Sequence, residues 1–376
     1  MQKRLRHSLW ALAIIFIIII AGYTAVFFAI RFGWTKVQGE IDPNSSLYNQ
    51  SLDSVMQETS ELDPPRTLPT SESIYGSNEI ANRCRLSVAG DLAEKNAVAI
   101  YEAYVATRSD LLLERMLLAL SFRIPDRRAF VTRLEACKGA STAPSFTTLS
   151  ERFNKAQGTN LYVWQNYEPW SIIRGALAKD MPVIERAGAE VGVQPRLIVS
   201  VAIVEQLRLF YTQRELFEKI FKPLNILASA NKMAWGILSI KEAAAISAER
   251  HLKDPSSPYY LGPEKEHLLD FPAGVNISSE RYRRLTNERD HYYSYLYGAV
   301  IIKQLEKQWE LAGHPIAYRP EVIATLFNLG FDKSKPKAAP EVGGSTITIE
   351  GRKYFFGSLA YEFYYSGELM DSFPYK

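Results

Sequence analysis

The sequence predicts a mainly α-helical protein with an N-terminal transmembrane helix and a short β-hairpin near the C-terminus. Residues 9–30 form an apolar run without a charged side chain, which is the length that roughly 30 Å of hydrocarbon requires of a helix. Apolar residues recur at helical spacing in residues 77–140 and dominate again from 161 to 331. The stretch "STITIEGRKYFF", residues 345–356, alternates as strands do and predicts the hairpin.

The charges around the apolar run predict its orientation. Lys3, Arg4 and Arg6 precede it without an acidic residue, so the positive-inside rule keeps residues 1–8 in the cytoplasm. We therefore expect a single-pass protein of the inner (cytoplasmic) membrane, with everything after Arg31 extracytoplasmic, in the periplasm. A cleaved signal peptide is the alternative, but its apolar region should span only about 7–15 residues.

The charge balance of the chain argues against nucleic-acid binding. The sequence has 44 basic and 41 acidic residues, a net charge of +3. The three N-terminal cations account for this excess, so the exported part lacks the basic surplus that phosphate backbones require.

The two cysteines, Cys84 and Cys137, can pair in an oxidising compartment. In the chain-entropy model, closing a loop of this length stabilises the fold by about 4 kcal/mol. Two unpaired buried thiols are the alternative.

The composition divides the exported part into three segments. Residues 31–75 are rich in Ser, Pro and acidic side chains and predict an unstructured tether. Residues 76–150 predict a small helical domain with no recognisable chemistry, and "GASTAPSFTT", residues 139–148, predicts a linker at its end. Residues 160–376 form the larger helical domain, in which the candidate site lies.

A carboxylate in an apolar helix is the main candidate for chemistry. The helix runs through residues 197–208, and Pro195 fits its first turn. Glu205 shares the apolar face with Val201. Burial disfavours an isolated charged carboxylate, so the group stays protonated near neutral pH, as general acid catalysis requires. The alternatives are an ion pair with Arg208, one turn later, or a place at the rim where the helix emerges.

Three further stretches follow the Val204-Glu205-Gln206 segment. They are "WGILSIKEAAA" with its turn at 236–245, "YLYGAVIIKQLEKQW" at 295–309 and "IATLFNLG" at 323–330. In this order, over residues 180–335, they resemble the motifs of the lysozyme-like lytic transglycosylase (SLT) superfamily. The sequence departs from the family pattern at Gln206, where Ser is usual, and at Ser239, where Gln is usual.

The resemblance implies a lysozyme-like catalytic domain that cleaves peptidoglycan. In this family one Glu, here Glu205, protonates the MurNAc-GlcNAc β-1,4 bond and then activates the muramoyl C6 hydroxyl. The product is a 1,6-anhydro end, and the enzyme is a lyase. The implied substrate-binding residues are Trp235, Gly236, Ile237, Ser239, Gln206, Phe327 and Asn328, and Tyr361 or Tyr364 would supply a nearby hydroxyl.

Two other functions remain open on the sequence. One is a non-catalytic scaffold that binds glycan or partner proteins of a cell-envelope apparatus, and the other is a muramidase that hydrolyses the same bond. Glu215, Glu218 and Glu242 are expected at the solvated surface, and hydrolysis with inversion would require one of them to face Glu205. The five histidines are scattered without metal-ligand spacing, and no cofactor motif is present. We therefore expect neither a metal nor a cofactor.

Overall fold

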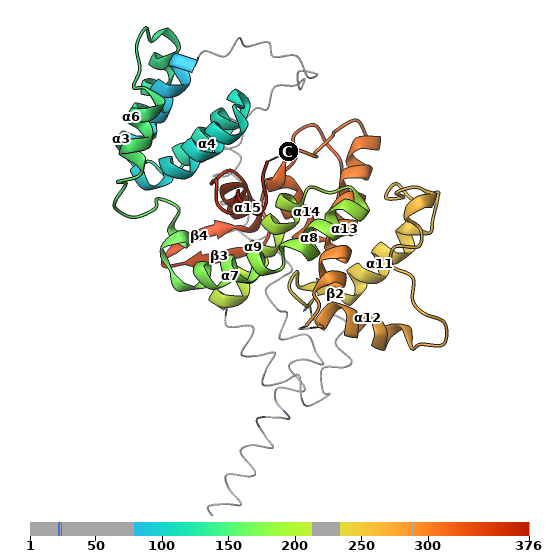
Figure 1. Cartoon of the computed structure of the whole chain (residues 1–376). Helices are drawn as coiled ribbons and strands as arrows, with labels where there is room; N and C mark the ends of the chain where they lie inside the picture. Colours follow the sequence, from blue (N-terminus) through green and yellow to red (C-terminus); the bar gives the residue numbers. More distant parts are fainter. Residues whose placement is uncertain (1–21, 23, 25–78, 213–233, 288, 376) are drawn as a thin grey trace, which may run out of the picture.

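The computed structural model describes residues 22, 24, 79–212, 234–287 and 289–375 (Figure 1). In these ranges the chain is mainly helical with short two-stranded sheets, which confirms the predicted mainly α class. The predicted tail, the tether and almost all of the predicted span at 9–30 lie outside these ranges. Among the described residues, no helix combines the length and apolar character that a membrane crossing requires.

The first part of the fold is a group of four helices. Ser109 and Asp126 cap the second and third helices by accepting hydrogen bonds from backbone N–H groups. The fourth helix begins inside the stretch predicted as a linker, because Ser145 accepts a hydrogen bond from the Thr148 amide at 3.1 Å and caps it. The helices are α3 (Glu79–Thr107), α4 (Asp110–Ser121), α5 (Arg127–Ala136) and α6 (Phe146–Phe153).

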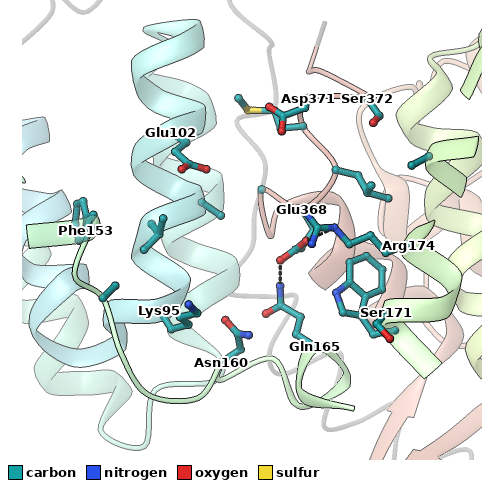
Figure 2. Close-up of a pocket in the computed structure, with 18 of the residues that line it drawn as sticks. Lys95, Glu102, Phe153, Asn160, Gln165, Ser171, Arg174, Glu368, Asp371 and Ser372 are labelled. Carbon is teal, nitrogen blue, oxygen red and sulfur yellow. Dashed lines mark hydrogen bonds and ion pairs between the residues drawn. The ribbon is translucent and has the colours of Figure 1, made fainter. Parts of the chain in front are cut away.

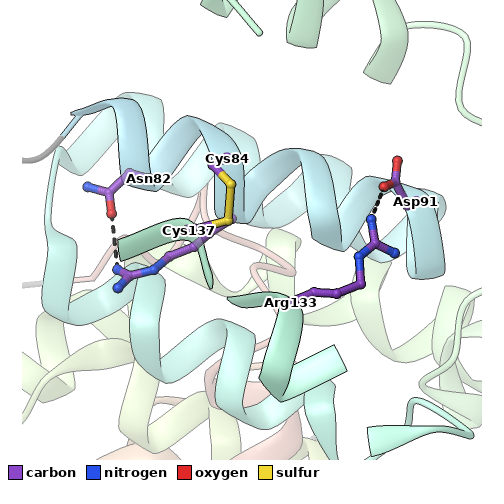
Figure 3. Close-up of a disulfide and its surroundings, with 6 residues drawn as sticks. Asn82, Cys84, Asp91, Arg133 and Cys137 are labelled. Atoms are coloured by element: carbon purple, nitrogen blue, oxygen red, sulfur yellow. Dashed lines mark hydrogen bonds and ion pairs between the residues drawn. A yellow bond between two sulfur atoms is a disulfide. The ribbon is translucent and has the colours of Figure 1, made fainter. Parts of the chain in front are cut away.

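A disulfide joins the two cysteines of this helical group (Figure 3). Cys84 lies on α3 and Cys137 directly follows α5, with their Cα atoms 5.6 Å apart. The pairing confirms the first of the two predicted states of the thiols. It fixes the end of α5 against α3.

The second part contains eight described helices and two small sheets. The helices are α7 (Glu168–Lys179), α8 (Met181–Val191), α9 (Pro195–Thr212), α11 (Glu242–Leu252), α12 (Ile277–Thr286), α13 (Tyr292–Leu311), α14 (Pro320–Leu329) and α15 (Phe356–Tyr364). The strands are β1 (Ala234–Trp235), β2 (Ile240–Lys241), β3 (Thr346–Ile349) and β4 (Arg352–Phe355), and β1 pairs with β2 and β3 with β4, both antiparallel.

The hairpin predicted near the C-terminus is confirmed. Thr346 pairs with Phe355 and Ile349 with Arg352. The two residues between the strands, 350 and 351, have φ values of 46° and 80°, as the favoured two-residue hairpin turns require.

Helix α9 is the central element of the second part (Figure 1). It contacts α7, α8, α13, α14, α15 and β3, and every side chain from residue 196 to 205 is buried. Pro195 begins the helix, as expected, because its missing N–H costs nothing in the first turn. The fully buried Arg196 donates hydrogen bonds of 2.9 Å to the carbonyls of Tyr364 and Phe373, so the C-terminal segment folds onto the start of α9.

The helical group and the second part pack against each other. Among the described residues, the buried apolar side chains from Leu86 to Phe373 form one continuous core. Polar contacts join α4 to α15 as well, since Arg115 donates to the Tyr365 hydroxyl at 2.9 Å. The two predicted domains are therefore in direct contact.

Candidate functional site

Helix α9 places Glu205 inside the protein. The residue is 3% exposed and shares its turn with fully buried apolar side chains, as the apolar face around it predicted. An ionised carboxylate in this position needs a partner of opposite charge.

Arg208 is that partner. Its Nε lies 3.0 Å from Glu205 Oε2 and its Nη2 makes a second contact with the same oxygen. The two side chains are 4% and 6% exposed, so the ion pair is buried. The structure therefore contains the ion pair with Arg208 that the sequence left open as an alternative to an isolated carboxylate. A guanidinium in this position stabilises the ionised carboxylate, whereas a general acid must carry a proton.

A small cavity next to the ion pair brings together four of the residues predicted to form the site. Glu205 comes from α9, Ser239 from the turn between β1 and β2, and Phe327 and Asn328 from the end of α14. The cavity has a volume of about 70 Å³. Its other lining residues are Arg208, Ile240, Lys241, Ala244, Ile301, Leu329, Gly330, Phe331 and Ser345.

The turn between β1 and β2 lies beside this cavity. Gln206 donates from Nε2 to the Ile237 carbonyl at 2.6 Å, so these two predicted substrate-binding residues are bonded to each other. Gly236 has a φ of 71°, and a Cβ there would lie 2.0 Å from the Leu285 carbonyl oxygen. A glycine is therefore required for packing against α12. Trp235 lies in β1, where only the backbone is described.

Asn328 has a structural role in addition to lining the cavity. Its Oδ1 accepts hydrogen bonds from the Ser345 amide at 2.8 Å and from the Ser345 hydroxyl at 2.9 Å. These bonds hold the end of α14 against the start of β3. Tyr364 donates its hydroxyl hydrogen bond to Gln194, and Tyr361 packs on Tyr365; neither lines the cavity.

Sequence reasoning underestimated the polar partners of the acidic residues. Glu242 was expected at the solvated surface, but it is 8% exposed and accepts hydrogen bonds from Ser278 at 2.9 Å and Arg281 at 3.5 Å. For Glu205, the sequence feature that indicates the ion pair is the three-residue spacing to Arg208, because this spacing places both side chains on one helix face. The other two candidates for a second carboxylate, Glu215 and Glu218, lie outside the described residues.

No group of three or more metal-ligating side chains occurs among the residues with described structure. No protein-family model, no curated protein and no solved structure matches the chain.

Proposed function

We propose that this chain is a non-catalytic, peptidoglycan-binding protein of the cell envelope, held at the cytoplasmic membrane by residues 9–30. The observation that carries the proposal is the buried ion pair between Glu205 and Arg208 next to a cavity of only about 70 Å³. Ligand pockets typically measure about 300–1,000 Å³. In this conformation the carboxylate is bound by the Arg208 guanidinium and lacks the space that glycosidic cleavage requires.

The energetics of the ion pair support a structural role. Removing one partner of a buried pair typically costs about 3–5 kcal/mol, because the remaining charge is left without compensation. Proton donation by Glu205 would require both separation from Arg208 and protonation of the carboxylate. Both steps would break the ion pair between Glu205 and Arg208.

A membrane-tethered position outside the cytoplasm is part of the proposal. The apolar run at 9–30 and the three cations before it favour an N-terminus in the cytoplasm. The Cys84–Cys137 disulfide is typical of proteins in oxidising compartments. An acidic tether at 31–75 would hold the helical part at the cell wall, where it can also contact proteins of an envelope apparatus.

The second candidate is the lytic transglycosylase activity that the motif resemblance implies. Its support is the convergence of Glu205, Ser239 and Asn328, from segments far apart in the sequence, on one cavity. A muramidase would use the same carboxylate with water in place of the C6 hydroxyl.

Purified sacculi distinguish these functions. We expect the full-length chain, purified in detergent, to sediment with sacculi and to release no soluble fragments. The double variant Glu205→Gln/Arg208→Met, which removes both charges, should sediment equally well. Release of anhydro-ended fragments by the wild type, abolished in this variant, would establish the transglycosylase instead, and fragments with reducing ends would establish the muramidase. A chain that stays in the supernatant refutes the proposal.

A further inference from the structure

A second, much larger cavity lies where the helical group meets the second part of the fold (Figure 2). Its volume of about 880 Å³ falls within the range of small-molecule and cofactor sites. One wall comes from α3, another from α7 with the segment before it, and the third from residues 367–372. We call it the interdomain cleft.

Two backbone features shape the interdomain cleft. Helix α3 is interrupted at Ala93, whose φ and ψ are −151° and 55°, and the half after this kink carries Lys95, Val98, Ala99 and Glu102 to the cleft. Opposite, Gly367 has a φ of 85°, and a Cβ there would lie 2.8 Å from the Ala99 Cβ. The two walls therefore touch at this point and close one side of the cleft.

Hydrogen bonds hold polar groups in place along the cleft. Gln165 donates from Nε2 to Glu368 Oε1 at 2.7 Å and accepts at Oε1 from Asn96 Nδ2 at 3.1 Å. Arg174 Nε lies 3.7 Å from Glu368 Oε2. Figure 2 shows Gln165, Glu368 and Arg174 together on one side of the cleft. Trp170 lines the cleft from within the core, since it is 5% exposed and packs edge-on against Trp164.

Two carboxylates of the cleft have no such partners. Glu102 and Asp371 are exposed, and neither side chain makes a hydrogen bond or an ion pair within the described residues. Partial burial of the carboxyl group, and then the charge of Asp371, raise the pKa of Glu102 above its ordinary value. Lys95 lines the same cleft and Arg174 is near Glu368. The cleft therefore offers three carboxylates against two cations.

The polar groups and the excess of carboxylates in the cleft suit a ligand that carries a positive charge and also has amide or hydroxyl groups. An ammonium group between Glu102 and Asp371 would offset their mutual repulsion. The hydrogen-bonded wall at Gln165 suits groups that both donate and accept hydrogen bonds.

We propose that the interdomain cleft binds a muropeptide, a wall fragment that joins a saccharide to a short peptide, with a free peptide amine between Glu102 and Asp371 and the saccharide toward Gln165 and Trp170. This inference rests on the proposed peptidoglycan-binding function. It assigns that function to a site about 880 Å³ in volume, whose lining residues lie outside residues 180–335.

The test is calorimetric titration of the full-length chain with a disaccharide-peptide that has a free side-chain amine. We expect the same ligand, once its amine is acetylated, to bind at least tenfold more weakly to the wild-type protein. The Glu102→Gln/Asp371→Asn variant should lose affinity for the free-amine ligand to a similar degree. Glu185→Gln, which removes an exposed carboxylate of α8 outside the cleft, should leave the affinity unchanged.

Equal affinity for the two ligands, or an unaffected double variant, overturns the inference. Sedimentation with sacculi separates this failure from that of the proposed function. Suppose that the wild type binds sacculi, but that neither acetylation of the amine nor the Glu102→Gln/Asp371→Asn substitutions change the affinity for the muropeptide. In that case only the assignment of the ligand to the cleft is wrong. If the wild type does not bind sacculi at all, the proposed function itself is wrong.

Discussion

Replacing Arg208 by Met should destabilise the protein strongly, because it leaves the carboxylate of Glu205 buried without a partner. The two side chains are 6% and 4% exposed, so bulk solvent stabilises the remaining carboxylate much less than it would at the surface. From the usual cost of breaking a buried pair, we expect the free energy of unfolding to fall by about 3–5 kcal/mol. Replacing both residues, as Glu205→Gln/Arg208→Met, should recover much of this loss, because no uncompensated charge remains.

Urea denaturation followed by circular dichroism measures these changes. The two single variants and the double variant form a cycle that isolates the coupling of the pair from the other contacts of each residue. Lys138→Met is a matched control, since Lys138 forms an ion pair with Glu135 at the same spacing but with side chains 62% and 59% exposed. Its loss should be at most about 1 kcal/mol.

Two results would refute this reasoning. If Arg208→Met costs no more than Lys138→Met, the ion pair is not the reason why Glu205 is buried. If Arg208→Met releases anhydro-ended fragments from sacculi that the wild type leaves intact, Glu205 is a catalytic acid that Arg208 suppresses.

Three further predictions concern stability. Replacing Cys84 and Cys137 by Ser should lower the free energy of unfolding by about 4 kcal/mol, and an unchanged urea midpoint would contradict a stabilising disulfide. Gly236→Ala should cost about 1–3 kcal/mol, because its Cβ meets a backbone carbonyl of α12 at 2.0 Å and its φ is positive. Gly175→Ala, with open space around the new Cβ, serves as the control in the same thermal melts. Burial raises the pKa of Glu306 above its ordinary value of 4.5. The Glu306 carboxyl group therefore stays protonated to higher pH in the folded chain than in the unfolded chain. The free energy of unfolding should therefore decrease as pH rises from about 4.5 through the raised pKa, and Glu306→Gln should remove this part of the decrease; identical pH profiles for the two proteins would contradict it.

Most of the local structure could be predicted from the sequence. The helical spacing of apolar residues predicted the mainly α class, and Pro195 marked the start of α9. The hairpin around residues 350 and 351 followed from alternation and turn chemistry. The linker at 139–148 was misplaced in part, because Ser145 caps a helix there.

The candidate site could be predicted only in part. Four of the residues that the motif order groups, Glu205, Ser239, Phe327 and Asn328, line one cavity. The motif order did not predict that the amide oxygen of Asn328 accepts hydrogen bonds from Ser345, because these bonds depend on how the hairpin folds back onto α14. The motif order also did not predict that Gly236 packs closely against α12.

The sequence by itself determined that the protein is mainly helical, that α9 begins near Pro195, and that an acid lies on the buried face of α9. These properties depend on neighbours within a few residues, so spacing and residue type are sufficient to predict them. Only the tertiary structure decided that Arg208 turns toward Glu205, how little space remains beside them, and that α3, α7 and the last residues enclose a cleft. Packing between segments far apart in the chain sets charge partners and cavity volumes, and helical periodicity carries no information about such packing.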